Sequence, residues 1–349
     1  MTKKVTMKDI AKKVGVSHPV VSAVINDNYK SVKVSEKTRK RVLEVVKEMS
    51  YFPNAAGRSL SNRRTSTIGF LLSDNAADGL SNAFYSRFLA AIEDACRRKK
   101  YGLNVSLYNL SNVDTFVFPQ KVGQRSVDGL ILAGYLEKTV VNHFREFGIP
   151  CICLGEDMEF ENMIANVCTE IVPKLFEIFD YLVGLGHKKI GICDESHRHE
   201  NCFSNRLRRQ SSEAGRELPA DIVEFTASTG FCDYQSGQDL YKEWVGLDIN
   251  QRPTAMISSD QTVISFMQQL RSNGFRCPED VSVVSTCDSR LCEYASPAVT
   301  AIRHPAVEMG EAAVNILVKA IEEDVDLTAA DSVHHIPCKI IYRESCREI

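Results

Sequence analysis

The chain has 349 residues, of which 44% are hydrophobic and 25% are charged. This length predicts about two or three domains with real cores, which excludes a small disulfide-stapled fold and a chain that is disordered throughout. No apolar run approaches the roughly 18 residues needed to cross a bilayer, and the stretch that follows Lys3 and Lys4 is polar instead of being a signal-peptide core. These features predict a cytoplasmic protein that is not exported.

The net charge of -3 hides a strong asymmetry along the chain. Residues 1–64 hold fifteen Lys or Arg and five Asp or Glu, a charge of +10, so the remainder carries -13. A small basic region joined to a large acidic one favours nucleic acid as partner, because Lys and Arg that neutralise phosphates release counterions. A solvated charged face is the alternative interpretation, and the spacing of the residues has to decide between them.

Three short helices are predicted in residues 1–50. Thr6 and Asp9 have the spacing of a capping box, and apolar residues follow at helical intervals up to the turn at Gly15. Ser17 then caps a second helix that has Pro19 in its first turn, and Ser35 caps a third. Two short helices joined by a tight glycine turn are typical of the helix-turn-helix, whose second helix enters the major groove of DNA.

The second predicted helix has one face for packing and one for a partner. Val20, Val21, Val24 and Ile25 are expected to point toward the core. The remaining positions are expected to face the groove, and these are His18, Pro19, Ser22, Ala23 and Asn26.

Residues 51–64 are predicted to form a hinge and linker. Pro53 fixes the chain direction and Asn54 can cap a helix that would run from Ala55 to Leu60. Such a helix has barely two turns and contains Gly57, so it is expected to be marginal on its own and to form only when something holds it. A linker in which Leu60 packs on the core is the alternative.

The rest of the chain alternates short apolar runs with longer amphipathic stretches. This alternation predicts βαβ units, hence two α/β lobes with parallel sheets, and ligands of such folds lie at the carboxyl ends of strands. The expected strands are 68–72, 129–133, 150–154, 189–193, 255–258 and 281–284, and the expected helices are 84–98, 175–185, 263–273 and 307–323.

The chain resembles the LacI/GalR family of bacterial repressors. The resemblance is carried by VTMKDIAKKVGVS (5–17), VSEKTRKRVLEVVKEMSYFPNAAGRSL (34–60), SVDGLILAG (126–134), LGHKKIGI (185–192) and PEDVSVV (278–284). It implies a dimer that binds a near-palindromic operator, with a small-molecule effector in a two-lobed domain of the type I periplasmic-binding-protein fold. The implied lobes are 65–166 with 302–331 and 167–301 with 332–349.

The resemblance also implies roles for single residues toward DNA. A family Thr and Arg usually stand where this chain has Val20 and Ala23, so its operator is expected to differ from the commonest one. Leu60 matches the leucine that the family wedges into the central base step. The residues expected to contact DNA are Thr6, Ser17, His18, Pro19, Ser22, Ala23, Asn26, Asn54, Ala55, Gly57, Arg58 and Leu60.

For the effector, the resemblance implies contacts from Phe84, Tyr85, Arg206, Ser259, Asp260 and Cys287. Two positions depart from the family: Ser259 stands where an Asn is usual and Cys287 stands where an Asp is usual. A thiol is a much poorer hydrogen-bond acceptor than a carboxylate. We therefore expect an uncommon ligand, a larger glycoside or no ligand, in place of an ordinary monosaccharide.

Other classes of protein are weaker alternatives. The twelve cysteines include no CxxC pair, and the spacing of Cys193, His197, His199 and Cys202 is not that of a standard zinc finger, so we expect free thiols and neither metal nor cofactor. An enzyme would have to use Asp260 or Asp288 beside Arg206, but no phosphate loop, nucleophile elbow or HExxH motif is present. A solute-binding protein of the same α/β fold would not need the basic helical region. A DNA-binding regulator that needs no effector stays open as an alternative.

Overall fold

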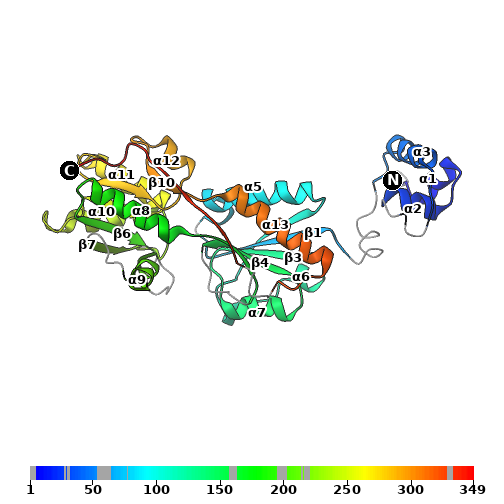
Figure 1. Cartoon of the computed structure of the whole chain (residues 1–349), viewed down its shortest axis with the longest axis horizontal. Coiled ribbons are helices and arrows are strands. Elements are labelled where there is room, and N and C mark those ends of the chain that lie inside the picture. Colours follow the sequence, from blue (N-terminus) through cyan, green and yellow to red (C-terminus); the bar gives the residue numbers. More distant parts are fainter. Residues whose placement is uncertain are drawn as a thin grey trace. The chain divides into compact units, whose positions relative to one another are not determined.

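The computed structural model describes residues 5–26, 29, 32–52, 64–76, 78–156, 163–194, 203–213, 215, 221–327 and 333–349. The chain divides into two compact units, residues 1–65 and residues 66–349 (Figure 1). Within the described part, no helix is both long and apolar enough to cross a membrane.

The first unit is a three-helix domain, as the sequence predicts. It contains α1 (Met7–Val14), α2 (His18–Ile25) and α3 (Glu36–Glu48). Thr6 and Asp9 form the predicted capping box, and Gly15 ends α1 in the left-handed conformation (φ 77°) that glycine adopts without strain. A small apolar core joins the three helices, with Ile10, Ala11, Val14, Val21, Val24, Val42 and Val45 buried.

The second unit contains two six-stranded sheets, which define two lobes. The sheet of the N-terminal lobe has the order β11-β5-β4-β3-β1-β2, and that of the C-terminal lobe has the order β12-β10-β9-β8-β6-β7. All described strand pairs are parallel except β10 with β12. The strands are β1 (Thr67–Ser73), β2 (Gly102–Tyr108), β3 (Gly129–Ala133), β4 (Cys151–Glu156), β5 (Ala165–Thr169), β6 (Lys189–Asp194), β7 (Asp221–Thr226), β8 (Ala255–Ser258), β9 (Ser282–Ser285), β10 (Thr300–Arg303), β11 (Val333–Ile336) and β12 (Lys339–Ile341).

Helices cover both sheets, so most strands read as continuous apolar runs. The helices of the N-terminal lobe are α5 (Ala83–Arg98), α6 (Gln120–Gly123), α7 (Lys138–Glu146) and α13 (Ala306–Glu323); those of the C-terminal lobe are α8 (Ile171–Gly184), α9 (Phe203–Glu213), α10 (Tyr234–Gly246), α11 (Asp260–Ser272) and α12 (Arg290–Tyr294). Close packing of α13 on α5 requires glycine at 310, because an added Cβ would lie 2.7 Å from that of Ala91.

The chain crosses between the two lobes three times, at places that correct the predicted boundaries. The crossings follow β5, β10 and β11, so residues 167–169 and 333–336 belong to the N-terminal sheet, and residues 302–303 belong to the C-terminal sheet. Each crossing therefore lies a few residues later than the expected boundaries near 166, 301 and 331. The apolar pattern could not locate them, because β5, β10 and β11, the strands that precede the crossings, are short and were not among the expected strands.

Cys151 and Cys153 lie on β4 in one apolar cluster of the N-terminal lobe, and burial raises the pKa of both thiols. The described cysteines are all free thiols, as the sequence predicts.

Candidate functional site

The exposed side of α2 is the first candidate site, and it differs in one respect from the prediction. Ser17, His18 and Pro19 are exposed at the start of the helix. Ser22 and Asn26 follow on later turns, partly buried, and Asn26 Nδ2 donates to Ser22 Oγ over 3.2 Å. These five predicted residues remain accessible to a partner.

Ala23 and Val20 exchange the environments expected for them. Ala23 is only 6% exposed, so the prediction that it stands outside the packed part of α2 is wrong; its single methyl group barely extends beyond the helix backbone. Val20 was expected to pack inward, but it is half-buried and does not belong to the apolar core formed by Val21 and Val24. The apolar side chain that α2 offers to a partner is therefore Val20.

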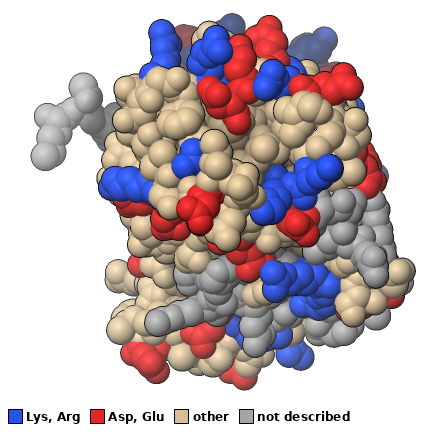
Figure 2. Space-filling model, turned by 90° about the vertical axis from the view of Figure 1, so that its left-hand side faces the viewer, with Lys and Arg blue, Asp and Glu red and all other residues tan. Residues whose placement is uncertain are grey.

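Basic side chains dominate the surface of the first unit. Among its described residues, Lys13 pairs with Glu48 over 2.6 Å and Arg39 pairs with Glu36 over 3.5 Å. Its other described basic residues are exposed, namely Lys8, Lys12, Lys33, Lys37, Lys40, Arg41, Lys47 and Arg64. By contrast, the face of the molecule shown in Figure 2 carries Lys and Arg interspersed with Asp and Glu. The uneven charge of the sequence thus becomes a basic surface on the three-helix unit.

The side chain of Thr6 already has a structural role, because its hydroxyl takes part in the N-terminal cap of α1. Its amide and its hydroxyl both donate to the Asp9 carboxylate, over 2.8 and 2.6 Å. Ser17 caps α2 without a side-chain hydrogen bond to the helix, so its exposed hydroxyl is not needed there. The hinge residues Asn54, Ala55, Gly57, Arg58 and Leu60 lie outside the described residues.

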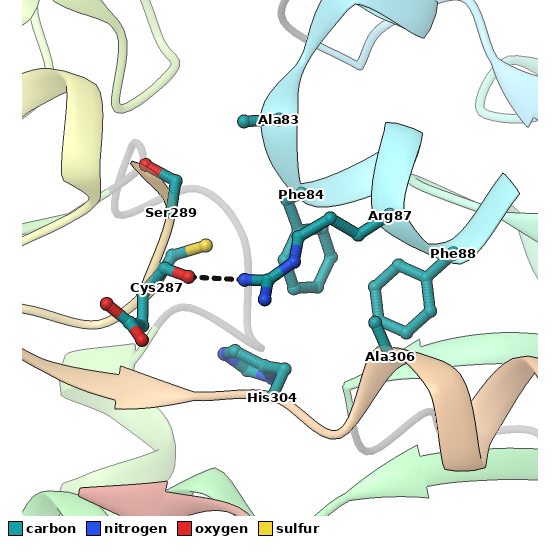
Figure 3. Close-up of a pocket in the computed structure, with 9 residues that line it drawn as sticks. Ala83, Phe84, Arg87, Phe88, Cys287, Ser289, His304 and Ala306 are labelled. Atoms are coloured by element: carbon teal, nitrogen blue, oxygen red, sulfur yellow. Dashed lines mark hydrogen bonds between the residues drawn. The ribbon is translucent and has the colours of Figure 1, made fainter. Parts of the chain in front are cut away.

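A small pocket between the two lobes is the second candidate site. Its free volume is about 10 Å³, room for about one water molecule and far below the roughly 300–1,000 Å³ typical of ligand pockets. Its lining comes from the start of α5, from the turn after β9 and from the crossing before α13 (Figure 3). The lining residues are Ala83, Phe84, Arg87, Phe88, Cys287, Asp288, Ser289, His304 and Ala306.

Asp288, the acidic residue that lines this pocket, forms ion pairs with two arginines of its own lobe. Asp288 pairs with Arg303 Nε over 2.6 Å and with Arg343 Nη2 over 2.8 Å, and its side chain is 2% exposed. Its backbone carbonyl faces the other lobe and accepts a hydrogen bond from Arg87 Nη1 over 2.6 Å, as Figure 3 shows. The loop at Asp288 therefore offers the pocket a carbonyl group, while its carboxylate is held by two guanidinium groups.

His304 connects the three crossings with the pocket. Its Nδ1 lies 3.3 Å from Thr169 Oγ1 and 3.8 Å from Cys338 Sγ, and its Nε2 lies 3.1 Å from the carbonyl oxygen of Thr286. Its ring also meets the edge of Phe84, with centroids 5.0 Å apart. A single buried imidazole thus touches residues from both lobes and from each crossing.

The structure brings only part of the predicted effector set together. Phe84 and Cys287 line the pocket, whereas Tyr85 packs edge-on against Phe84 and partly into the apolar core of the N-terminal lobe. Arg206 lies on α9, and its side chain is outside the described part.

Ser259 and Asp260 serve the C-terminal lobe itself. Ser259 Oγ donates to the carbonyl of Cys232 over 2.5 Å. Burial raises the pKa of Asp260, although hydrogen bonds from Ser289 and from the Gln261 amide oppose the shift.

Arg87, Ser289 and His304 line the pocket but were not predicted. Arg87 sits one helical turn after Phe84, so the helical period of α5 was the signal that could have found it. The other two occupy loop positions that only the folded chain brings together.

Two further contacts join the lobes near their facing loops. Gln261 Nε2 donates to Asp78 Oδ2 over 2.6 Å, and the rings of Tyr135 and Phe231 lie 5.8 Å apart. The lobes thus touch through their own side chains.

The part of the chain that the structure describes holds no cluster of three or more His, Cys, Asp or Glu arranged for a metal ion. Of the four residues considered for zinc, Cys193 is buried at the end of β6, and His197, His199 and Cys202 lie outside the described residues.

Comparisons with known proteins agree with the two-part organisation. Residues 6–54 match the family model described as bacterial regulatory proteins of the lacI family, and residues 179–346 match a periplasmic binding protein-like domain. Catabolite control protein A of Priestia megaterium is 26% identical over 98% of this chain and 99% of its own. The transcriptional repressor PurR of Klebsiella pneumoniae is 27% identical over 94% of each chain.

Two solved structures show the same fold over nearly the whole chain. One is the lac repressor dimer bound to operator and the anti-inducer ONPF, with 23% identity, a TM-score of 0.78, and coverage of 99% of this chain and 100% of that one. The other is a complex of the transcriptional regulator CelR with cellobiose, with 23% identity, a TM-score of 0.63, and coverage of 98% and 100%.

The basic helix-turn-helix, the two parallel-sheet lobes and these matches confirm the fold that the sequence predicts. The chain joins a DNA-binding domain of the lacI family of bacterial regulatory proteins to a periplasmic binding protein-like domain, and it is a DNA-binding transcriptional regulator.

Proposed function

We propose that the protein is a repressor that binds a near-palindromic operator as a homodimer, with α2 of each subunit in a major groove. The observation that carries this proposal is the exposed start of α2 within a basic three-helix unit. Because Ser17, His18 and Pro19 lie at the amino end of the helix, they are the first side chains to reach base edges when the helix enters a groove. A repressor of this kind works in the cytoplasm, where it meets DNA.

We assign further DNA contacts to other residues on the same side of the three-helix unit. Ser22 and Asn26 lie on successive turns and offer a hydroxyl and an amide, which suit phosphates and adenine edges. Val20 offers an apolar contact to a thymine methyl group, and Thr6 contacts the backbone beside the capped start of α1. Ala23 makes at most a close approach, because it is 6% exposed.

The hinge residues complete the proposed DNA interface. Asn54, Ala55, Gly57, Arg58 and Leu60 form a helix when bound in the minor groove, and Leu60 enters the central base step. This assignment is supported by the sequence alone: the segment is too short and too glycine-containing to be a stable helix in isolation.

We further propose that a small molecule in the pocket between the lobes changes operator affinity. The pocket touches both lobes and lies beside His304, where the crossings meet, so a ligand there shifts the balance between two lobe arrangements. A coupling of roughly 1 to 3 kcal/mol suffices for regulation. An effector-independent regulator is the second candidate, favoured by the direct lobe contacts of Arg87 and Gln261.

The proposal is tested by operator selection followed by salt titration. We expect a near-palindromic consensus bound by a dimer, with an observed affinity that falls steeply with salt because each half-site neutralises several phosphates. A chain that starts at residue 66 retains the second compact unit and is expected to lose operator binding. A flat salt response, or retained operator binding by the shortened chain, contradicts the proposal.

A further inference from the structure

We propose that the pocket between the lobes takes an anionic ligand, a small molecule whose carboxylate or phosphate group is bound by Arg87. The inference deepens the proposed function, since it rests on the pocket being the effector site. It gives a chemical class to the uncommon ligand expected from the sequence, and it is carried by the charges that face the pocket.

Arg87 presents a guanidinium group to the pocket without a carboxylate partner among the described residues. It projects from the first turns of α5 toward the turn after β9, where Nη1 donates to the carbonyl of Asp288 over 2.6 Å (Figure 3). A guanidinium group has five N–H donors in a planar fork, and a neutral carbonyl satisfies only one of them. The residue is also exposed, so a ligand entering the pocket can reach it.

The nearby carboxylates are committed elsewhere. The carboxylate of Asp288 is held by Arg303 and Arg343, and it is 2% exposed. Asp260 is buried behind the same turn, where it accepts a hydrogen bond from Ser289, and burial raises its pKa. Among the described residues that line the pocket, Arg87 is thus a cation whose charge is not balanced by the Asp288 carboxylate, which Arg303 and Arg343 hold.

An anion fits this arrangement better than a hydroxyl group. A carboxylate or phosphate accepts two parallel hydrogen bonds from a guanidinium fork and gains from its charge, whereas a sugar hydroxyl gains neither. Such a group would take the place of the Asp288 carbonyl on Arg87. The rings of Phe84 and Phe88, whose centroids lie 4.8 Å apart, line the pocket and offer an apolar surface to the rest of the ligand.

The test compares ligands that differ only in charge. Calorimetric titration of the full chain with glucose and glucuronate, galactose and galacturonate, and glucose 6-phosphate separates neutral, carboxylate and phosphate groups; inorganic phosphate reports the anion alone. We expect at least one of the anionic sugars to bind at least tenfold more tightly than its neutral counterpart. Preference for the uronates or for the phosphate then identifies the anion.

Two arginine variants on one helix make the test specific. Arg87→Gln keeps a polar side chain but removes the charge, and we expect it to weaken binding of the anionic sugar at least tenfold. Arg97→Gln removes an arginine farther along α5, where it pairs with Asp94 on the surface, and we expect unchanged binding. Circular dichroism checks that both variants are folded.

Three outcomes overturn the inference: equal binding of a neutral and an anionic sugar, unchanged anion binding by Arg87→Gln, or no binding by any anion of the panel. Operator binding by the same preparation of the unaltered chain, measured without ligand, keeps the two proposals apart. A chain that binds its operator but no anion refutes only the ligand class, while a chain that binds no operator refutes the proposed function.

Discussion

Arg343, close to the C-terminus, reaches Asp288 in the turn after β9, with Nη2 2.8 Å from a carboxylate oxygen and side-chain exposures of 12% and 2%. The same guanidinium group donates from Nη1 to the carbonyl of Val299 over 2.5 Å. This pairing fixes the turn that presents the Asp288 carbonyl to the pocket. Removing one partner of a buried ion pair strongly destabilises the folded protein, because the other partner is left buried with an uncompensated charge.

We therefore expect Asp288→Asn to lower the free energy of unfolding of the C-terminal lobe by about 3 kcal/mol. The measurement is urea unfolding followed by the fluorescence of Trp244, which is the single tryptophan of the chain and lies in the core of that lobe. Glu177→Gln is the matched control, because this residue of the same lobe is 51% exposed in its pair with Lys174 and the loss should cost less than about 1 kcal/mol. Similar losses in both variants would refute the role given to Asp288.

The core of the three-helix unit gives a second prediction. Val42 is fully buried between the helices, while its neighbour Leu43 is 43% exposed on the same helix. Val42→Ala should destabilise this small unit by about 2 kcal/mol and weaken operator binding, whereas Leu43→Ala should have little effect. The Trp244 unfolding transition should stay in place in both variants, because it reports the other unit. A shift of that transition in Val42→Ala would show that the two units do not unfold separately.

A third prediction concerns the hinge. Leu60→Ala should weaken binding to the specific operator by about 2 to 3 kcal/mol and leave nonspecific binding nearly unchanged, since only a bent, specific complex uses the wedge. Gel-shift titrations on operator and on random DNA at one salt concentration measure the difference. Equal losses on both DNAs would show that Leu60 acts in folding or packing instead.

The fourth prediction is a pH dependence that originates at His187. Burial lowers the pKa of this imidazole below its ordinary 6.5, and the charge of Arg347 acts in the same direction, although a hydrogen bond with the Arg347 backbone opposes the shift. Its Nδ1 lies 2.8 Å from Thr254 Oγ1. The unfolded chain then binds the proton more readily than the folded chain. The stability contributed by the neutral ring is present above about pH 6.5 and is lost as the pH falls toward the lowered value.

The Trp244 urea midpoint of the unaltered chain should accordingly fall between pH 7.5 and pH 5.5. In His187→Gln this fall should be smaller, because the residue no longer titrates. His143→Gln, at an exposed position on α7, is the control and should keep the full dependence. An equal fall in His187→Gln would place the titrating group elsewhere.

The sequence was sufficient for the fold because local and global signals agree. The capping box of Thr6 and Asp9, the glycine turn and the buried strands each specify their own element. Half of the twelve described strands were missed. The edge strands β2, β7, β11 and β12 are partly exposed and lack a continuous apolar run. The inner strands β5 and β10 are buried, but they are short and contain polar residues such as Asn166 and Thr300. The prediction that Ala23 faces the groove was wrong. The pattern of apolar residues shows in which direction a side chain points, but it does not show whether a side chain as short as alanine reaches the surface.

The pocket was predicted only in part, since its residues meet through the crossings and not through sequence spacing. Phe84 was found from the resemblance, whereas Arg87 acquires its role only because the turn at Asp288 folds against α5. The sequence likewise shows Asp288 as an available acid. Only the folded structure shows that this carboxylate forms ion pairs with Arg303 and Arg343.

The third crossing sets a condition on how the protein is made. The N-terminal lobe begins at β1, yet its sheet is completed by β11, and α13 supplies a large part of its apolar core. A ribosome therefore has to deliver nearly the entire polypeptide before this lobe can close, although the three-helix unit can form as soon as it emerges. A chain truncated after β10 would therefore have a folded three-helix unit and an incomplete N-terminal lobe. We expect such a chain to be degraded by proteases before it can act as a regulator.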